Sequence, residues 1–371
     1  MPSHAQSSPQ SSEPQLIPRS REEREQKYQN LHRLFLNVQL SSSSGQRTGG
    51  LKPSDFTILE DHQLRKIASF QSIQDDSNGA GVRIILVLDA VNNSSGKVTQ
   101  FRKEIEKYLK SGNGLLAHST SIALFSDNGI KLGVPSQDHA TLLEELNQLA
   151  GNIHTSTCAD MTSAMECGMP VTRNDNFSRA CDPNPRLACL NRLFNSSVAA
   201  LVSVAQEQVN RSGRVIVVWI GQGWPMLNQP GFIPDTPEVK ESFYRDLVTV
   251  SSAITEAQIT LDAVASSEIL PIDPKHIHDS FFFQGVSDKN HVSAASLSLQ
   301  AIAYQSGGLV LTSTRDIAGQ IARCVADSDS YYSLAFDYPP ASQFGEYHPL
   351  EVKIDKPDIT VRTRTLYYAE Q

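Results

Sequence analysis

The chain has 371 residues, enough for two or three domains of the usual ~100–200 residues, which excludes a small disulfide-knotted protein. Hydrophobic residues make up 39% and charged residues 19%, and no apolar run approaches the ~18 residues that a membrane span needs. The net charge of -8 repels phosphate backbones and anionic lipids. We therefore expect no nucleic-acid partner and no membrane span.

The N-terminal segment is polar and of low complexity. Residues 1–30 contain too little apolar surface to offset the loss of chain entropy, so we expect them to be disordered. No apolar stretch typical of a signal peptide occurs there. The segment could be the remainder after cleavage of an export signal, or the signal could have preceded Met1.

Strand patterns dominate the next part of the chain. Residues 34–40, 55–60 and 64–70 read as short strands, and the last two alternate apolar and polar residues with a period of two. This alternation is typical of antiparallel sheets with one wet face. A polar, glycine-containing linker over 75–81 then separates these strands from a segment with a different pattern of hydrophobic residues.

From residue 82 onward, buried strands alternate with helices. The run 82–88 is almost continuously apolar and ends at Asp89, as expected of a central strand in a parallel sheet. The further predicted strands are 121–125, 214–220, 259–264 and 309–312. The predicted helices are 98–109, 140–149, 190–209, 238–257, 292–306 and a short one ending at 325. This alternation predicts an α/β fold with a doubly wound, mostly parallel sheet and helices on both faces.

The C-terminal part returns to strands. Residues 331–338, 350–354 and 359–368 have strand composition, and prolines mark the turns between them. Neither terminal group of three strands buries enough surface alone. We predict that 31–78 and 329–371 form one discontinuous antiparallel β-sandwich, into which the α/β domain of residues 79–328 is inserted.

Four of the five cysteines cluster in a predicted insertion at 151–189. They are Cys158, Cys167, Cys181 and Cys189. Their spacing lacks the short CxxC pairs of a structural zinc site, so disulfides are the favoured interpretation. Four cysteines allow three connectivities, all of which stay open. Nested 158–189 and 167–181 pairs would suit a single long loop. An oxidising location, secreted or periplasmic, would follow; the alternative is a cytoplasmic protein with unpaired thiols.

The strand ends are the places to search for a site, because open α/β sheets bind ligands outside the carboxyl ends of their strands. No glycine-rich phosphate loop, Walker lysine or GxSxG motif occurs there. Nucleotide binding and α/β-hydrolase chemistry are therefore not expected. The polar residues at these ends suggest a binding face made of Asp89, Asn92, Asn93, Ser94, Asp127, Gln222 and Trp224.

Several segments resemble, in order, members of one known family. Asp89 closes the first central strand, and the other segments are 51–61 with 66–70, 158–161, 331–340 and 361–368. These resemble the bacterial "VWFA-related domain" proteins, which contain a von Willebrand factor A-like domain. The resemblance covers about residues 34–369 and implies a von Willebrand factor A-like fold.

The resemblance also implies where a cation site would lie. In cation-binding A domains, a DxSxS sequence after the first strand, a threonine and a second aspartate form a metal-ion-dependent adhesion site with oxygen ligands. Here Val91 and Asn93 replace the two serines, and Gly221 to Gly223 stand where the second aspartate is expected. We expect a degenerate site with no cofactor; if Mg²⁺ or Ca²⁺ binds at all, Asp89 and Asn93 would hold it weakly.

We therefore expect a non-enzymatic binding module that recognises a protein or a surface polymer. One alternative is a cation-dependent adhesion module in which Asp127 or Asp160 supplements Asp89 and Asn93. A more remote alternative is a hydrolase of unfamiliar type that uses Asp89 or the pair His276 and His278. The sequence does not indicate an oligomeric state.

Overall fold

The computed structural model describes most of the chain. The described residues are 32–42, 50–74, 81–111, 115–150, 183–211, 213–224, 236–266, 283–292, 294–328, 330–356 and 358–369. The predicted disordered N-terminus and most of the cysteine-rich insertion lie outside these ranges. Within them, no helix is both long enough and apolar enough to cross a membrane.

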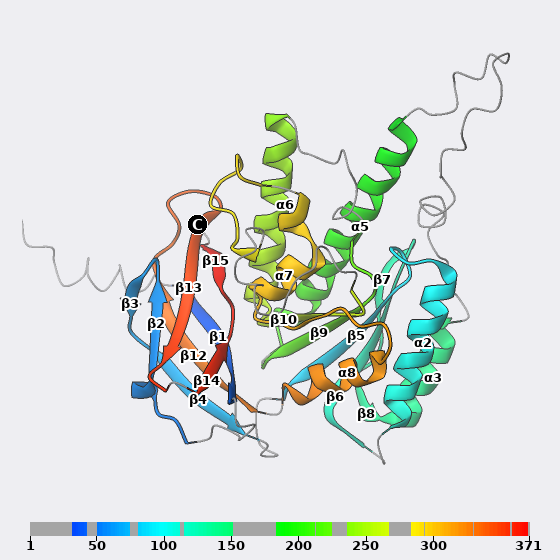
Figure 1. The fold of residues 1–371 in the computed structure, drawn as a ribbon, viewed down its shortest axis with the longest axis horizontal. Coiled ribbons are helices and arrows are strands. Elements are labelled where there is room, and N and C mark those ends of the chain that lie inside the picture. The colour runs from blue at the N-terminus through cyan, green and yellow to red at the C-terminus, as the bar shows by residue number, and fades with distance from the viewer. Residues whose placement is uncertain are drawn as a thin grey trace, which may run out of the picture.

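A seven-stranded, mostly parallel sheet forms the centre of the α/β part (Figure 1). Its strand order is β11-β10-β9-β5-β6-β7, and β8 pairs with β6. The strands are β5 (Arg83–Asp89), β6 (Leu115–Ser126), β7 (Gly129–Leu132), β8 (Ser136–Asp138), β9 (Val215–Ile220), β10 (Ile259–Val264) and β11 (Val310–Leu311). β7 and β8 run antiparallel to β6, and the other neighbours are parallel. The predicted mostly parallel α/β sheet is confirmed.

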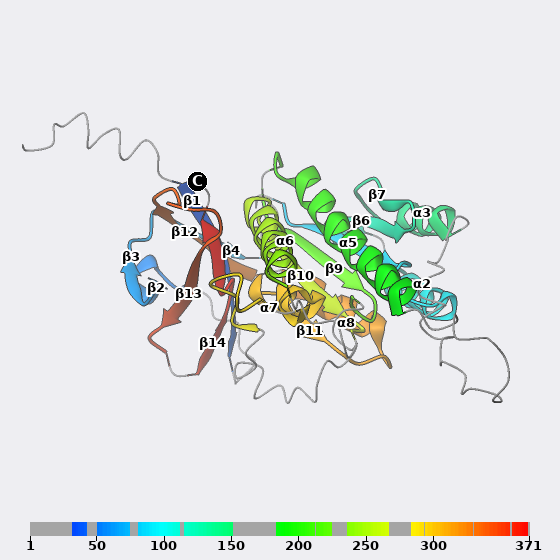
Figure 2. The same cartoon turned by 90° about the horizontal axis from the view of Figure 1, so that it is seen from above.

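Helices cover both faces of this sheet. They are α2 (Ser95–Lys110), α3 (His139–Ala150), α5 (Pro183–Gln208), α6 (Pro237–Glu256), α7 (Leu299–Gln305) and α8 (Ile317–Ala326). In β5, Ile84 and Leu86 pack with residues of α2, α3 and α8, whereas Ile85 and Val87 pack with α5, α6 and α7. Seen from above, α5 and α6 run side by side over the sheet (Figure 2). Burial on both faces explains why β5 is continuously apolar.

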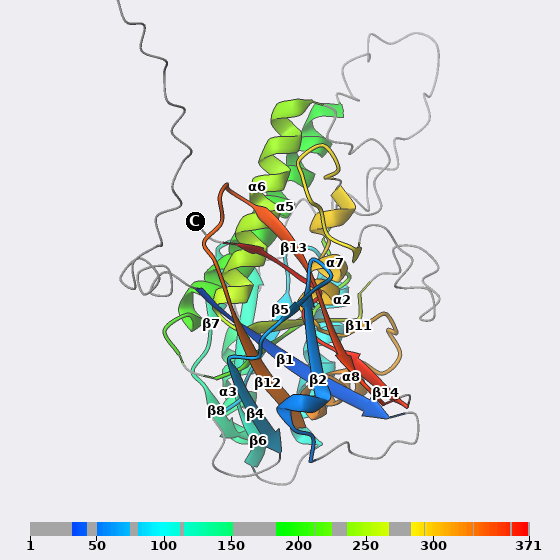
Figure 3. The same cartoon turned by 90° about the vertical axis from the view of Figure 1, so that its left-hand side faces the viewer.

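Two four-stranded antiparallel sheets lie beside the α/β part, and both combine strands from the two ends of the chain. One has the order β14-β1-β12-β4 and the other β15-β13-β2-β3. Their strands are β1 (His32–Ser42), β2 (Phe56–Glu60), β3 (Gln63–Arg65), β4 (Ser69–Gln74), β12 (Ser330–Tyr338), β13 (Glu346–Ile354), β14 (Ile359–Arg362) and β15 (Leu366–Ala369). Both sheets contribute to one buried core, so they form a sandwich, which Figure 3 turns toward the viewer. The division into separately folding domains stays a prediction.

Three predicted elements are interrupted in the structure. The strand over 64–70 is split into β3 and β4, and the strand over 359–368 into β14 and β15. In both cases the two pieces belong to different sheets of the sandwich, so the backbone must leave one ladder to join the other. The helix over 292–306 is also split, into a 3-10 turn (Ala294–Leu297) and α7. Ser298 caps α7 by accepting a hydrogen bond from the Ala301 amide at 3.0 Å, which fixes the start of the helix.

A group of buried charges lies where the sandwich meets the central sheet. Arg214, immediately before β9, is 1% exposed, and its guanidinium lies 4.8 Å above the ring of Tyr331 in β12. Burial lowers the pKa of Arg214 to about 10, and the charges of Asp327 and Asp262 oppose that fall. Arg362 of β14 forms an ion pair with Asp327, which follows α8. Charged groups thus connect the two parts of the molecule.

Candidate functional site

The strongest candidate site lies at the carboxyl ends of β5 and β9, the neighbouring strands at which the order of the central sheet reverses. Such a reversal separates the loops that follow the two strands and places a crevice between them. Asp89 ends β5, and Gly221 directly follows β9. The structure therefore brings together two of the segments that the sequence nominated.

The Asp89 carboxylate is fully buried and accepts four hydrogen bonds. Oδ1 accepts from the backbone amides of Val91 and Asn92 at 3.0 and 2.9 Å. Oδ2 accepts from Asn92 Nδ2 at 2.8 Å and from Trp219 Nε1 at 2.9 Å. Burial raises the pKa of Asp89, while the bonds from Asn92, Trp219 and Val91 oppose the rise. Among the described residues, all four hydrogen-bond partners of this carboxylate are N–H donors.

Asn93, in the loop after β5, and Gly221, in the loop after β9, close the site between them. Asn93 is 1% exposed; its Nδ2 donates to the Asp89 carbonyl at 2.9 Å, and its Oδ1 accepts from the Gln222 amide at 3.1 Å. A Cβ atom on Gly221 would lie 2.8 Å from Asn93 Nδ2 and 3.0 Å from Asp89 Cβ. With Asn93 in this position, residue 221 has no room for a side chain. The replacement of the second serine by Asn93 and the replacement of the second aspartate by Gly221 are thus physically coupled.

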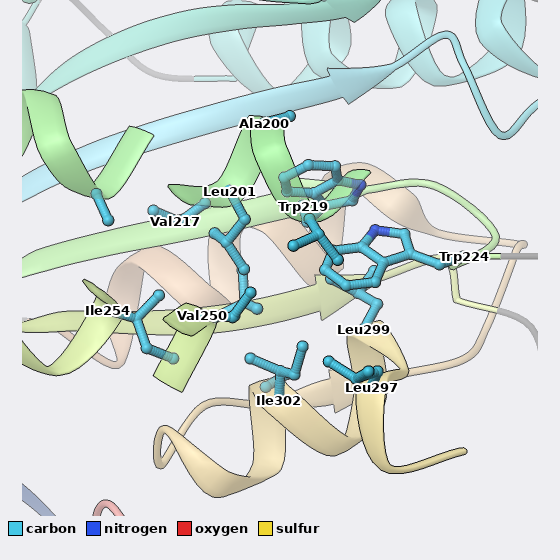
Figure 4. Packing of buried hydrophobic residues seen from close by; sticks show 14 of the residues in the cluster. Ala200, Leu201, Val217, Trp219, Trp224, Val250, Ile254, Leu297, Leu299 and Ile302 are labelled. Atoms are coloured by element: carbon cyan, nitrogen blue, oxygen red, sulfur yellow. The ribbon is translucent and has the colours of Figure 1, made fainter. Parts of the chain in front are cut away.

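Trp224 is buried and is not an exposed recognition aromatic. It is 3% exposed, and its ring makes edge contacts with Trp219 at 5.9 Å and Phe194 at 6.4 Å between centroids. Figure 4 shows the two tryptophans side by side above Leu299. The sequence placed Trp224 at the rim because it follows a glycine turn, but the aromatic neighbours of α5 and β9 draw it into the core. Trp224 Nε1 has no hydrogen-bond partner among the described residues.

The remaining members of the predicted face differ in exposure. Asp127, in the turn between β6 and β7, is exposed, whereas Asn92, Ser94 and Gln222 are half-buried. The Asn92 side chain is also held by α5, because its Nδ2 donates to Ser197 Oγ at 2.9 Å. The part of the predicted face that a partner can touch is therefore formed by Asn92, Ser94, Asp127 and Gln222.

Several predicted candidates lie outside the described residues. These are Cys158, Cys167, Cys181, Asp160, His276 and His278. Cys189 lies in α5, and the fifth cysteine, Cys324, is buried in α8 without a disulfide. The disulfide pairing and the two alternatives that use these residues stay predictions.

One group of potential metal ligands in the described part of the chain was not predicted. Glu60, Asp61 and His348 place ligand atoms within 4.8 Å of one another at the turn after β2 and in β13. Glu60 already pairs with Arg65 and the Tyr367 hydroxyl, and His348 Nδ1 lies 2.7 Å from Asp61 Oδ2. These partners make the group an internal polar network. No sequence pattern could reveal it, because His348 and Asp61 are 287 residues apart.

Comparison with known proteins yields only distant structural similarity. No family model and no curated protein matches the chain. Three solved structures that match are the pilus adhesin SpaC from Lactobacillus rhamnosus GG, manganese-loaded TRAP protein of Plasmodium vivax, and proximal thread matrix protein 1 from the mussel byssus with a zinc occupied MIDAS motif. Their sequence identities are 8%, 8% and 11%, and their TM-scores are 0.40, 0.33 and 0.32.

The matched regions differ in extent. They cover 85%, 80% and 73% of this chain, and 47%, 97% and 49% of the adhesin, the Plasmodium protein and the byssus protein, respectively. The chain thus spans about half the length of the adhesin and of the byssus protein. Because all three TM-scores are below 0.5, the α/β assignment rests on the strand order and helix placement of this chain.

Proposed function

We propose that the chain is a non-enzymatic binding module whose strand-end face recognises a protein or a surface polymer without a bound cation. The observation that carries the proposal is the Asp89 carboxylate, whose two oxygens accept four N–H donors. A cation would meet the positive ends of these dipoles and would have to displace them from a buried carboxylate. The four N–H donors stabilise the negative charge of Asp89, as a bound cation does in a metal-ion-dependent adhesion site.

A cation-dependent adhesion module is the second candidate, favoured by the position of Asp89 at the strand-order reversal. It would need further oxygen ligands within reach. Val91 has none, Gly221 has no side chain, and the Asn93 oxygen accepts from the Gln222 amide. Asp127 is exposed in another loop. This arrangement leaves one carboxylate for a hard cation, so the metal-free mode is the better-supported reading.

The proposal excludes catalysis at Asp89 on chemical grounds. A general acid or base must reach a substrate proton directly or through one water molecule. Asp89 is 0% exposed, and its two oxygens already accept four N–H donors, so a substrate proton cannot reach it without displacing them. A secreted or periplasmic location and disulfides in the 151–189 insertion remain part of the proposal as expectations from the sequence.

The experiment that tests the metal-free mode is thermal unfolding of chelator-stripped protein with and without about 10 mM Mg²⁺, Ca²⁺ or Mn²⁺, because a ligand of the native state raises stability. We expect no change in the unfolding midpoint with any of the three ions. A rise that disappears in an Asp89→Ala variant would replace the proposal with the cation-dependent one.

The binding face is tested by charge reversal at its exposed corner. Asp127→Arg should abolish capture of a binding partner from a surface extract of the source cells, with EDTA present throughout. The matched control is Glu144→Arg, an exposed charge reversal on α3, which should leave capture intact. Equal capture by both variants would place the binding surface elsewhere.

A further inference from the structure

A groove of about 800 Å³ runs between the α/β part and the sandwich, away from the strand-end face. Residues 309–313 form one wall, and residues 350–352 and 360–365 form the other. Its volume lies within the ~300–1,000 Å³ that ligand pockets commonly have. Leu311, Val352 and Val361 give the walls an apolar component.

Two sheet edges border this groove. Within the part of the chain that the structure describes, β11 is the last strand of the central sheet and pairs only with β10, and β14 is the last strand of its sandwich sheet and pairs only with β1. The carbonyls of Leu309 and Leu311 accept hydrogen bonds from Ala263 and Ser266, on the β10 side. Because alternate residues of a strand direct their backbone groups to opposite sides, the Val310 amide and carbonyl point to the open edge. An exposed edge of this kind is a template for a further strand.

The groove also has an excess of positive charge. Arg364 is 6% exposed, and among the described residues its guanidinium donates to the carbonyls of Ile254 and Ile259, at 3.4 and 3.2 Å. Arg323, on α8, is exposed. Among the described residues, neither guanidinium has a carboxylate within 4.0 Å. Carbonyls outside the groove thus hold the Arg364 guanidinium, whereas Arg323 is free to pair with an anion in the groove.

The other charges of the groove are already paired. Arg362 forms its ion pair with Asp327, and Glu351, the carboxylate that lines the groove, lies 3.1 Å from Lys353. The hydroxyls of Thr363 and Thr365, on either side of Arg364, are buried and have no hydrogen-bond partner among the described residues. Open backbone edges, an exposed arginine without a carboxylate partner and buried hydroxyls without a hydrogen-bond partner thus occur together in the described part of this groove.

We propose that this groove binds an extended segment of a partner protein, which adds a strand along β11 and directs a carboxylate toward Arg323. Backbone hydrogen bonds to an edge strand give such complexes affinity, and pockets for alternate side chains give them specificity. The apolar wall residues would receive the side chains that flank the acidic one. This surface does not depend on the strand-end face, so the two proposals can fail separately.

The test starts from a displayed library of random decapeptides selected on the full chain. We expect enriched peptides to carry an acidic residue at a fixed position between apolar ones. Arg323→Glu should weaken them by at least about tenfold, as reversal of a charge in a complementary interface does. The matched control is Arg211→Glu, an exposed arginine of the α/β part outside this groove, which should leave their affinity unchanged. Enrichment without acidic residues, or equal binding to both variants, would overturn the proposal.

Hydrogen exchange of the full chain locates the bound peptide. We expect the Val310 amide to exchange freely in the unbound chain and a bound peptide to slow its exchange. Slow exchange before any peptide is added would mean that the chain fills its own groove. Dimerisation that Arg323→Glu abolishes in sedimentation would assign the groove to a second copy. Either of these two results would also overturn the partner proposal.

Discussion

Two buried aspartates on the central sheet are compensated in opposite ways. Asp89, at the end of β5, is surrounded by four N–H donors and no cationic side chain. Asp262, in β10, accepts one backbone bond from Leu309 at 2.7 Å and lies in the field of Arg214 and Arg362. Neighbouring N–H dipoles stabilise the Asp89 carboxylate locally, whereas Asp262 interacts with charged side chains at the junction with the sandwich. The second arrangement should respond far more strongly to mutation and pH.

Removal of Arg214 should have the largest effect. Arg214→Ala leaves Asp262 and Asp327 without part of their counter-charge and removes the contact with the Tyr331 ring. Replacing a large, fully buried side chain by alanine costs about 3–5 kcal/mol, and we expect a loss of that order in the free energy of unfolding, measured with urea. The control is Arg33→Ala, which removes an exposed partner of Asp337 and should cost much less. Equal losses would contradict the role of burial.

The free energy of unfolding should fall as pH rises, because Asp262 loses its proton. Burial raises its pKa to about 6 from the ordinary 3.8, so the folded state holds this proton more tightly than the unfolded state. The resulting stabilisation is complete below about pH 4 and is lost as pH rises through about 6, by roughly 3 kcal/mol. Asp262→Asn keeps an acceptor for the Leu309 amide and should flatten this part of the profile. Urea titrations from pH 4 to 7 measure both slopes, and identical slopes would contradict the assignment.

The two tryptophans provide a matched pair for the strand-end site. Trp219→Phe removes the hydrogen bond to Asp89, whereas Trp224→Phe removes a ring nitrogen that has no partner among the described residues. Both changes cost similar ring area. A hydrogen bond to a charged group contributes about 1.5–3 kcal/mol, so Trp219→Phe should be the more destabilising by about 2 kcal/mol. Equal destabilisation would mean that the Asp89 bond contributes nothing.

The sequence predicted the central sheet better than the sandwich for a physical reason. β5, β9 and β10 are buried on both faces, so their apolar runs identify them without knowledge of their partners. The breaks between β3 and β4 and between β14 and β15 depend on which sheet each piece joins, and that pairing is non-local. Likewise, Asp89 and Asn93 could be nominated from the loop after β5. Their bonds to Trp219 and Gln222 could not, because those partners lie in another loop or strand.

The smallest predicted effect is a gain of cation binding at the strand-end site. The variant Val91→Ser, Asn93→Ser, Gly221→Asp supplies hydroxyl oxygens and a second carboxylate. Shortening residue 93 removes the amide nitrogen that lies 2.8 Å from the Cβ position of residue 221, and Asp89 Cβ, at 3.0 Å, must shift slightly. At a Mg²⁺ concentration ten times the dissociation constant, mass action would stabilise the variant by roughly 1.4 kcal/mol. Thermal unfolding with and without Mg²⁺ measures this gain. The matched control is Val91→Ser, Asn93→Ser, which retains Gly221 and should show none. The Trp219 and Asn92 donors remain in the triple variant. Stabilisation by Mg²⁺ would therefore show that the native site excludes the cation because it lacks oxygen ligands. If Mg²⁺ does not stabilise the variant, the N–H donors around Asp89 are what excludes the cation.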